Sequence, residues 1–292
     1  MTSALATATV VPAFNIPYLP MMKPVVAALG YTGAFGLIQV ARLEWEKFQA
    51  RSLKAIRDEY EAAKDERCTR LHLDHVPVID EDNKRVDYRA IIAEAIALGY
   101  QSVMVDGSRL PLAENIAATR QMAEMAHAAG VPLEAELGAV LGHEAGPLPP
   151  YDELFASGKG FTDADDAARF VRETGADWLS VAIGNVHGAI TAVRRDKKKV
   201  EARLNIEHLK RIRRVTGVPL VLHGGSGIRR EYILAAVKEG IAKINVGTAI
   251  RQPYEVGAKQ SAKAAEEATY RATVAVITSE LGIAGSAARI NP

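Results

Sequence analysis

Short apolar runs alternate with longer amphipathic stretches along the whole chain. Several of the runs are apolar almost throughout, which is typical of parallel strands that are covered on both faces. The runs are Val10–Phe14, Phe35–Val40, Thr69–Leu73, Gln101–Val105, Leu133–Leu137, Trp178–Ile183, Pro219–Leu222 and Ala242–Val246. They predict eight strands.

The stretches between the runs carry apolar residues at helical spacing, and several end at a glycine, a frequent helix stop. One helix is expected to begin at Thr162, an N-cap residue with Asp165 three positions later, and to reach about Thr174. Val140–Phe161 is the longest stretch without a regular pattern. The other predicted helices are Tyr88–Leu98, Leu112–Ala129, Ile206–Val215 and Glu231–Lys238, with a helical tail from Ile250 to about Glu280.

Strand–helix alternation repeated eight times predicts a (β/α)8 barrel, and 292 residues is a typical length for one. We expect residues 1–292 to form a single barrel with a C-terminal helical tail over about 250–292. A doubly wound open sheet is the alternative. It normally has fewer strands at this length, and no GxGxxG motif opens a first strand–helix unit here.

Composition narrows the class of protein without naming a reaction. The chain is 48% hydrophobic and 24% charged, with a formal net charge of +1, which argues against a largely disordered chain and against a dedicated nucleic-acid binder. No apolar run reaches the roughly 18 residues that span a bilayer, and no signal-peptide pattern opens the chain. The lone cysteine, Cys68, suits a reducing compartment. We therefore expect a cytoplasmic protein without a nucleic-acid or membrane partner.

Polar residues lie within or shortly after seven of the eight apolar runs, toward their C-terminal ends. In a barrel, the active site lies at the C-terminal ends of the strands, so these residues are expected to share one rim. They are Asn15, Asp74, His75, Asp106, Ser108, Glu134, Glu136, Asn185, His187, His223, Asn245 and Thr248.

Three of the seven histidines lie at three different strand ends, beside carboxylates. Neutral imidazole is the commonest zinc ligand, and three protein ligands with one open position is the pattern of catalytic zinc. His75, His187 and His223 therefore predict a divalent-metal site. His72, three residues before His75, is expected to face the other way and is the weaker candidate. His127 and His208 lie within predicted helices and are interpreted as structural or surface residues.

Two glycine-containing turns suggest a place for an anion. The first, His223–Ile228, reads HGGSGI between a strand and a helix, and the second, Asn245–Thr248, follows the last strand. Barrel enzymes often bind phosphate between the loops after strands seven and eight; two ordinary turns remain the alternative. A basic run at 194–199 is either a solvated loop or a further contact for an anionic substrate. Glu144, in the long loop after the fifth strand, is a candidate base.

At these residues the sequence resembles the class II, metal-dependent fructose-bisphosphate and tagatose-bisphosphate aldolases. The resemblance spans most of the chain, and LHLDH, GNVHG and LHGGSG together are a specific signature. The matching segments are AFNI (13–16), LHLDH (71–75), VMVDGS (103–108), EAELG (134–138), AIGNVHG (182–188), VLHGGSGI (221–228) and KINVGT (243–248).

The resemblance implies a (β/α)8 barrel that acts on a phosphorylated sugar as a homodimer or homotetramer. It implies catalytic Zn²⁺ on His75, His187 and His223, with Asp74 as the acid/base. Asp106 and Glu136 match positions of a second or alternative metal, and some members also bind a monovalent cation. Glu144 matches a loop carboxylate implicated in proton transfer. Residues that match those holding the dihydroxyacetone-phosphate portion are Gly188, Gly224, Ser226, Asn245 and Thr248, and Asn15 is a further substrate-binding candidate.

The expected reaction is the reversible cleavage of fructose 1,6-bisphosphate, or of a related ketose phosphate, into dihydroxyacetone phosphate and an aldehyde. Zinc as the electron sink makes a Schiff-base lysine unnecessary, so Lys243 is interpreted as structural. A metal-dependent barrel hydrolase and a non-catalytic barrel subunit are the alternatives.

Three departures from the family pattern lie where the aldehyde half would bind. Ala41 stands where the family commonly has a serine, Pro17-Tyr18 where it often has an asparagine, and Ala189-Ile190 where it often has an aromatic residue. The aldehyde specificity therefore stays open, with Arg42 as a hypothetical substitute for the lost contacts.

Overall fold

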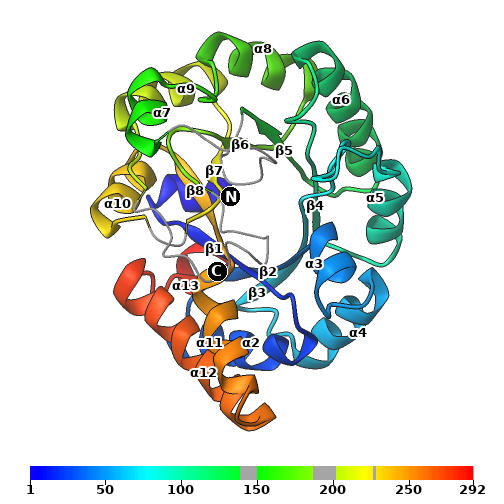
Figure 1. The fold of residues 1–292 in the computed structure, drawn as a ribbon, viewed down its shortest axis with the longest axis vertical. Helices are drawn as coiled ribbons and strands as arrows, with labels where there is room; N and C mark the ends of the chain where they lie inside the picture. The colour runs from blue at the N-terminus through cyan, green and yellow to red at the C-terminus, as the bar shows by residue number, and fades with distance from the viewer. Residues whose placement is uncertain (139–149, 187–201, 226–227, 292) are drawn as a thin grey trace.

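The chain forms a closed barrel of eight parallel strands surrounded by helices, seen along the barrel in the computed structural model of Figure 1. The structure describes residues 1–138, 150–186, 202–225 and 228–291. Each strand pairs in parallel with the next, and β1 pairs with β8 to close the ring. The closure confirms the predicted (β/α)8 barrel and excludes the open doubly wound sheet.

All eight predicted strands are present, with ends within two residues of the predicted ones. Their observed bounds are β1 Val11–Asn15, β2 Gly36–Ala41, β3 Thr69–Asp74, β4 Ser102–Val105, β5 Leu133–Leu137, β6 Trp178–Val181, β7 Leu220–Leu222 and β8 Ile241–Val246.

The predicted helices are also present. The observed helices are α1 Thr2–Ala6, α2 Met22–Thr32, α3 Arg42–Lys47, α4 Leu53–Ala63, α5 Tyr88–Ala97, α6 Leu112–Ala128, α7 Tyr151–Ser157, α8 Ala164–Thr174, α9 Ile206–Thr216, α10 Arg230–Lys238, α11 Thr248–Ala258, α12 Ala262–Ala275 and α13 Ala287–Ile290. A 3-10 turn at Leu19–Met21 and a π-helical turn at Val276–Glu280 complete the described elements.

Two details differ from the predictions. The N-cap of α8 is Asp163, whose carboxylate accepts hydrogen bonds from the backbone of Asp165 and Asp166; Thr162 is buried instead, because its hydroxyl accepts a hydrogen bond from Ala182 N at 2.8 Å and donates one to Leu137 O. The stretch Val140–Phe161, expected to be irregular, contains the helix α7.

The apolar core lies mainly between the strands and the outer helices. A smaller apolar cluster fills the N-terminal end of the barrel, where Val11, Leu37, Trp178 and Val221 pack together with Ala4 of α1. Beyond β8, α11 and α12 pack on each other, and α12 packs along α2 on one side of the barrel (Figure 1). In the part of the chain that the structure describes, no helix is long and apolar enough to cross a membrane.

The interior toward the C-terminal ends of the strands is polar. Glu134 on β5 contacts Lys243 on β8 and His223 after β7, which lie elsewhere around the ring, so these side chains point inward. Side chains alternate along a strand, so residues two positions apart point the same way. Glu136 follows Glu134 by two positions and Asn245 follows Lys243 by two, so both point inward nearer the mouth of the barrel. Asp74, near the end of β3, also points inward there.

Candidate active site

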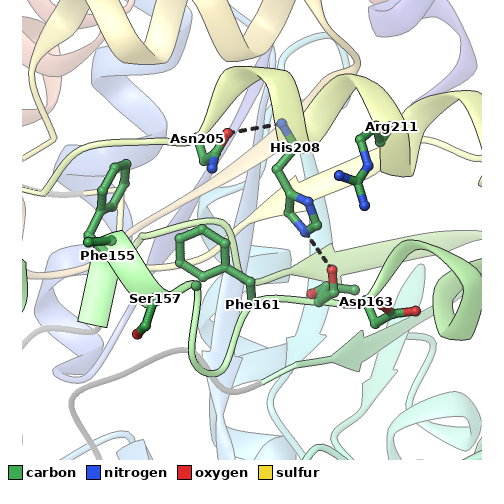
Figure 2. A pocket seen from close by; sticks show the side chains of 10 residues that line it. Phe155, Ser157, Phe161, Asp163, Asn205, His208 and Arg211 are labelled. Carbon is green, nitrogen blue, oxygen red and sulfur yellow. Dashed lines mark hydrogen bonds between the residues drawn. The ribbon is translucent and has the colours of Figure 1, made fainter. Parts of the chain in front are cut away.

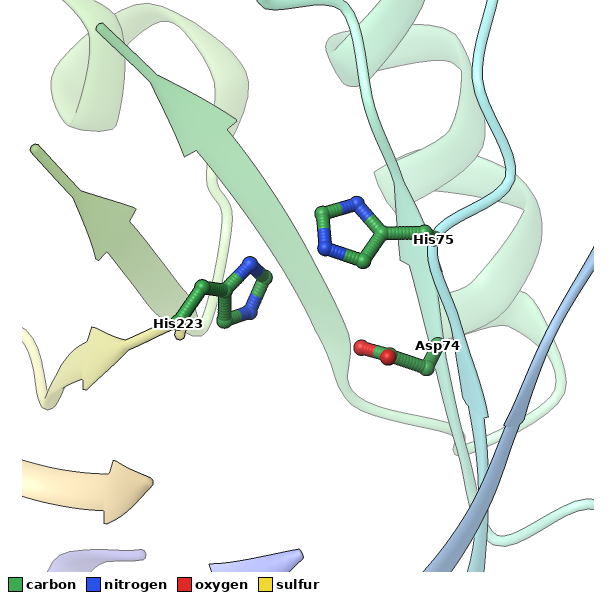
Figure 3. A group of neighbouring side chains, drawn as sticks. All are labelled: Asp74, His75 and His223. Carbon is green, nitrogen blue, oxygen red and sulfur yellow. The ribbon is translucent and has the colours of Figure 1, made fainter. Parts of the chain in front are cut away.

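Two imidazoles and a carboxylate converge at the mouth of the barrel. The rings of His75 and His223 lie edge to face with their centroids 4.4 Å apart, and Asp74 lies beside them (Figure 3). One ligand atom from each of the three lies within 4.8 Å of the others. We call Asp74, His75 and His223 the upper cluster. His187, the third predicted zinc ligand, lies outside the described residues.

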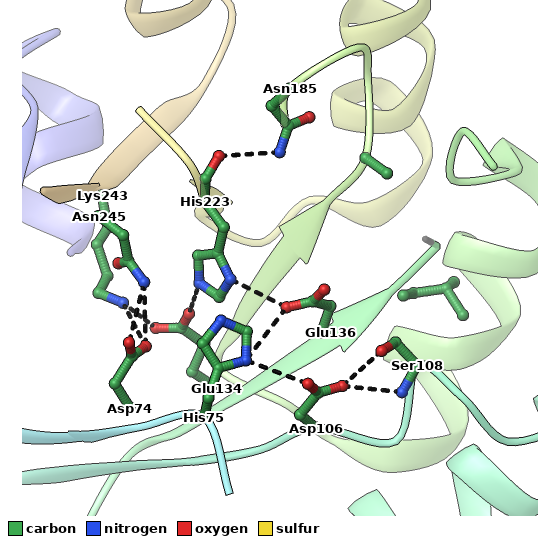
Figure 4. A network of polar contacts seen from close by, with 12 residues as sticks. Asp74, His75, Asp106, Ser108, Glu134, Glu136, Asn185, His223, Lys243 and Asn245 are labelled. Atoms are coloured by element: carbon green, nitrogen blue, oxygen red, sulfur yellow. Dashed lines mark hydrogen bonds and ion pairs between the residues drawn. The ribbon is translucent and has the colours of Figure 1, made fainter. Parts of the chain in front are cut away.

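A second set of carboxylates flanks the same imidazoles (Figure 4). His75 Nδ1 lies 3.1 Å from Asp106 Oδ2, and His223 Nδ1 lies 2.9 Å from Glu136 Oε2. Ser108 holds the other oxygen of Asp106 through its hydroxyl at 2.6 Å and its backbone N–H at 3.0 Å. Burial would lower the pKa of His75, but the charges of Asp74, Asp106 and Glu136 outweigh it and raise that pKa to about 10. The mouth thus attracts positive charge.

A third set lies deeper in the barrel. We call His72, Asp74 and Glu134 the lower cluster; one ligand atom from each also lies within 4.8 Å of the others. His72 Nδ1 lies 2.8 Å from Ser102 Oγ, and burial together with the nearby Lys243 charge lowers the pKa of His72 to about 3. The imidazole of His72 is therefore neutral at ordinary pH.

The expectation that His72 faces away from the site is wrong. His72 points into the barrel, as Asp74 does, because both lie on β3 two positions apart. His75 comes one residue after the strand ends, so the alternation of strand side chains does not govern its direction.

Asp74 is buried, with 1% of its surface exposed, and is surrounded by donors. The amide groups of Asn15 and Gln39 each donate to Oδ2 at 3.2 Å, and that of Asn245 donates to Oδ1 at 3.1 Å. Burial would raise its pKa, but the positive charges of His75 and Lys243 outweigh burial and hold the pKa of Asp74 below its usual range. Asp74 is thus an ionised carboxylate at ordinary pH, as a proton acceptor requires.

Of the predicted substrate residues, Asn15 and Asn245 both lie on Asp74. Thr248 begins α11, and the start of that helix lies near Asn15, because a Cβ added to Gly247 would be 3.6 Å from Asn15 Oδ1. Gly224 has a positive φ of 68°, which favours glycine. Asn185 donates to His223 O at 3.0 Å and so holds the backbone of β7's end. Gly188, Ser226 and Glu144 lie outside the described residues.

Sequence reasoning missed one further carboxyl at the mouth. Glu44 of α3 is 7% exposed and accepts a hydrogen bond from Ala41 N at 2.8 Å. Burial and the nearby charge of Asp74 raise its pKa to about 8. In the sequence, a glutamate in the first turn of a short helix indicates only a capping residue, so nothing there marks Glu44 as part of the site.

Arg42 is engaged with other side chains. Its guanidinium lies 3.5 Å from Asp80 Oδ2 and 3.8 Å from Glu46 Oε1. Two carboxylates thus balance the charge that was expected to substitute for lost substrate contacts.

A separate hollow of about 350 Å³ lies outside the barrel, among α7, α8 and α9 (Figure 2). None of its lining residues is a predicted site residue. His208 lies in the wall of this hollow. Its Nε2 lies 2.7 Å from Thr162 O, and its backbone N–H donates a hydrogen bond to the side chain of Asn205. This confirms the structural interpretation of His208.

The fold and the mouth together define a (β/α)8 barrel with a candidate divalent-metal site. The family model for class II fructose-bisphosphate aldolase matches residues 1–287. The chain therefore belongs to the class II fructose-bisphosphate aldolase family.

Individual relatives agree with this assignment. The chain is 44% identical over 171 residues to the uncharacterized protein YdjI of Escherichia coli K12, covering 59% of this chain and 56% of that protein. It is 38% identical over 178 residues to the fructose-bisphosphate aldolase of Geobacillus stearothermophilus, covering 61% and 53%. These matches thus span about half the length of the curated relatives.

Solved structures resemble the whole barrel. The crystal structure of the YdjI aldolase from E. coli K12 superposes with a TM-score of 0.76 at 28% identity, covering 98% of this chain and 96% of that one. A putative fructose-1,6-bisphosphate aldolase from Coccidioides immitis gives 0.77 at 24% identity, with the same coverage, which supports the fold alone.

Proposed function

We propose that this protein is a zinc-dependent class II aldolase, an aldehyde-lyase that reversibly cleaves a phosphorylated ketose into dihydroxyacetone phosphate and an aldehyde. The observation that carries the proposal is an ionised, buried Asp74 beside two imidazoles at the mouth of the barrel. Family membership and the aldolases among its relatives support it.

The donor set fits a divalent metal. Two imidazoles of the upper cluster and His187 would hold the zinc, while Asp106 and Glu136 offer hard oxygen ligands for a second or alternative ion. When bound, zinc supplies a Lewis acid that stabilises negative charge developing next to a carbonyl. A monovalent cation near the phosphate belongs to the same proposal.

Asp74 acts as the base. It takes the proton of the C4 hydroxyl as the C3–C4 bond breaks and the new aldehyde carbonyl forms, and it returns that proton in the condensation direction. The amides of Asn15, Gln39 and Asn245 orient the carboxylate, and Asn245 is placed to contact substrate as well. Glu144 would move the proton at the ketone fragment.

The phosphate of the dihydroxyacetone-phosphate portion would bind across the ends of β7 and β8. Gly188, Gly224, Ser226 and Thr248 are the proposed contacts, and the N-terminus of α11 adds a favourable dipole there.

Fructose 1,6-bisphosphate is one substrate, and a different ketose phosphate of sugar or polyol catabolism is the second candidate. The second is favoured at one point: Ala41 offers no hydroxyl at the end of β2, and Arg42 beside it is balanced by Asp80 and Glu46. We also propose that residues 1–292 act as one barrel with a helical tail, as a cytoplasmic homodimer or homotetramer without nucleic-acid or membrane partners.

The test is release of a triose phosphate from a panel of ketose mono- and bisphosphates, followed with a coupled dehydrogenase. Chelation should abolish cleavage, and Zn²⁺ should restore it. Asp74→Asn should lower kcat by about 10²–10⁴-fold, because an amide cannot accept the proton. The exposed Asp58→Asn on α4 is the matched control and should cleave like the wild type. Cleavage that survives thorough chelation would overturn the proposal; phosphate release without triose phosphate would point to the hydrolase.

A further inference from the structure

A lysine is sealed inside the barrel below the upper cluster. Lys243 lies on β8 with none of its surface exposed. Its ammonium lies 2.8 Å from Glu134 Oε2 and 3.9 Å from Asp74 Oδ1 (Figure 4). It therefore sits between two of the three members of the lower cluster.

Glu134 joins this ammonium to the imidazole of His223. Its Oε1 lies 2.8 Å from His223 Nε2, and its Oε2 lies 3.5 Å from His72 Nε2. One oxygen of the Glu134 carboxylate thus lies on the lysine and the other on the histidine.

This arrangement decides which nitrogen of His223 faces the mouth. Each ring nitrogen of His223 faces a carboxylate, Nε2 that of Glu134 and Nδ1 that of Glu136 at 2.9 Å. With Nε2–H kept on Glu134, Nδ1 is the nitrogen that His223 would offer to a metal at the upper cluster.

The same ammonium occupies the lower cluster. His72, Asp74 and Glu134 offer buried ligand atoms within 4.8 Å of one another, which is a donor set suited to a cation. A divalent ion entering there would meet the positive charge of Lys243 in a low-dielectric interior, where repulsion is strong.

We propose that Lys243 is a positioning residue, a built-in cation that keeps Glu134 on His223 Nε2 and excludes divalent metal from the lower cluster. The role rests on the proposed metal site at the upper cluster. A Schiff-base role requires an amine that substrate can reach, whereas Lys243 is fully buried and ion-paired. A purely structural ion pair would affect folding stability and leave metal stoichiometry unchanged.

Co²⁺ titration of the metal-free full chain tests the exclusion. Lys243→Met keeps the length of the side chain and removes its charge, so this variant should bind one more Co²⁺ per chain than the wild type. Lys243→Met/Glu134→Gln removes a ligand of the lower cluster as well, and its stoichiometry should return to the wild-type value. Lys54→Met, at an exposed lysine on α4, is the matched control and should titrate like the wild type.

Co²⁺ affinity tests the positioning of His223 and does not depend on the stability of Lys243→Met. In Glu134→Gln the single amide oxygen cannot serve both Lys243 and His223, so affinity should fall about 10–100-fold, a usual loss for a residue that orients a metal ligand. The double variant should regain most of that loss, because the amide oxygen can then turn to His223.

Wild-type stoichiometry in a folded Lys243→Met, or a double variant that binds Co²⁺ no better than Glu134→Gln, would overturn this role while leaving the proposed function intact. A wild-type chain that binds no Co²⁺ would overturn the metal site itself.

Discussion

Two buried carboxyl groups lie close together at the mouth, and one is ionised while the other is neutral. Asp74 receives side-chain amide hydrogens from three residues and faces Lys243, so burial does not neutralise it. Glu44 is almost as deeply buried, and the backbone N–H of Ala41 donates to it. Its pKa rises to about 8. Surrounding groups, not residue type, decide which carboxyl is the base.

The neutral form of Glu44 has a measurable consequence for stability. The folded-state pKa of Glu44 lies above the ordinary glutamate value of 4.5, so the folded chain binds this proton more tightly than the unfolded chain. The contribution of Glu44 is full below about pH 4.5 and is lost as pH rises toward 8. Glu44→Gln mimics the neutral acid and still accepts from Ala41 N. As pH rises, the free energy of unfolding of the variant should therefore increase relative to that of the wild type, by up to about 1.4 kcal/mol per pH unit.

Urea unfolding of both proteins between pH 5 and 8 measures this difference. The exposed Glu114→Gln, in the first turn of α6, is the matched control and should track the wild type. A constant difference between Glu44→Gln and the wild type across this range would show that Glu44 is ionised in the folded chain.

At the scale of elements, Thr162 fastens the long segment before α8 to the barrel. Its backbone N–H donates to Ala182 O at 2.9 Å, and its hydroxyl bridges Leu137 O at the end of β5 and Ala182 N beyond β6. Asp163 next to it caps α8 from the surface. The buried residue therefore ties two strand ends together, whereas the exposed one serves only its own helix.

The two neighbours should differ in their effect on stability. Thr162→Val keeps the shape but leaves the buried N–H of Ala182 and the part-buried carbonyl of Leu137 without the hydroxyl, which should cost about 1–3 kcal/mol. Asp163→Ala removes a cap and should cost about 1 kcal/mol. Chemical denaturation of the two variants and the wild type gives both values. A larger loss for Asp163→Ala than for Thr162→Val would contradict the predicted order of the two effects.

The strands could be located from the sequence because both of their faces are buried, which makes them apolar almost throughout. Residues such as Leu71 and Val103 pack under the helices on the outer face, and the barrel interior buries the inner face. The strand-end rule then found Asp74, His75 and His223. This rule could not find the roles of Gln39, Glu134 or Lys243. Each of them acts on a partner residue from another strand, and the sequence alone does not show which residues the closed ring brings together. The local pattern predicts Thr162 as a cap because an N-cap threonine and a threonine with a buried hydroxyl look the same in the sequence.

At the scale of the whole molecule, closing the ring concentrates negative charge at one end of the barrel. The carboxylates of Asp74, Asp106, Glu134 and Glu136 gather in the described mouth and interior, with Lys243 among them. Carboxylates crowded in a low-dielectric interior repel one another unless cations lie among them. Lys243 supplies one positive charge below, and His75, whose pKa is raised to about 10, supplies another. A divalent ion at the upper cluster would therefore also relieve repulsion that the fold itself creates.

Metal should consequently stabilise the barrel as a whole. The upper cluster draws its ligands from the ends of β3 and β7, which lie on different parts of the ring, so the folded chain offers a preformed site that the unfolded chain lacks. With free Zn²⁺ buffered at about 100 times the dissociation constant, the gain should be about 2.7 kcal/mol, a rise in Tm of about 5 °C. Calorimetry with and without Zn²⁺ measures it. His75→Ala/His223→Ala should melt at the same temperature in both conditions, because the variant lacks two of the three imidazoles proposed to hold the zinc. A Zn²⁺-dependent rise of equal size in that variant would place the stabilising metal elsewhere.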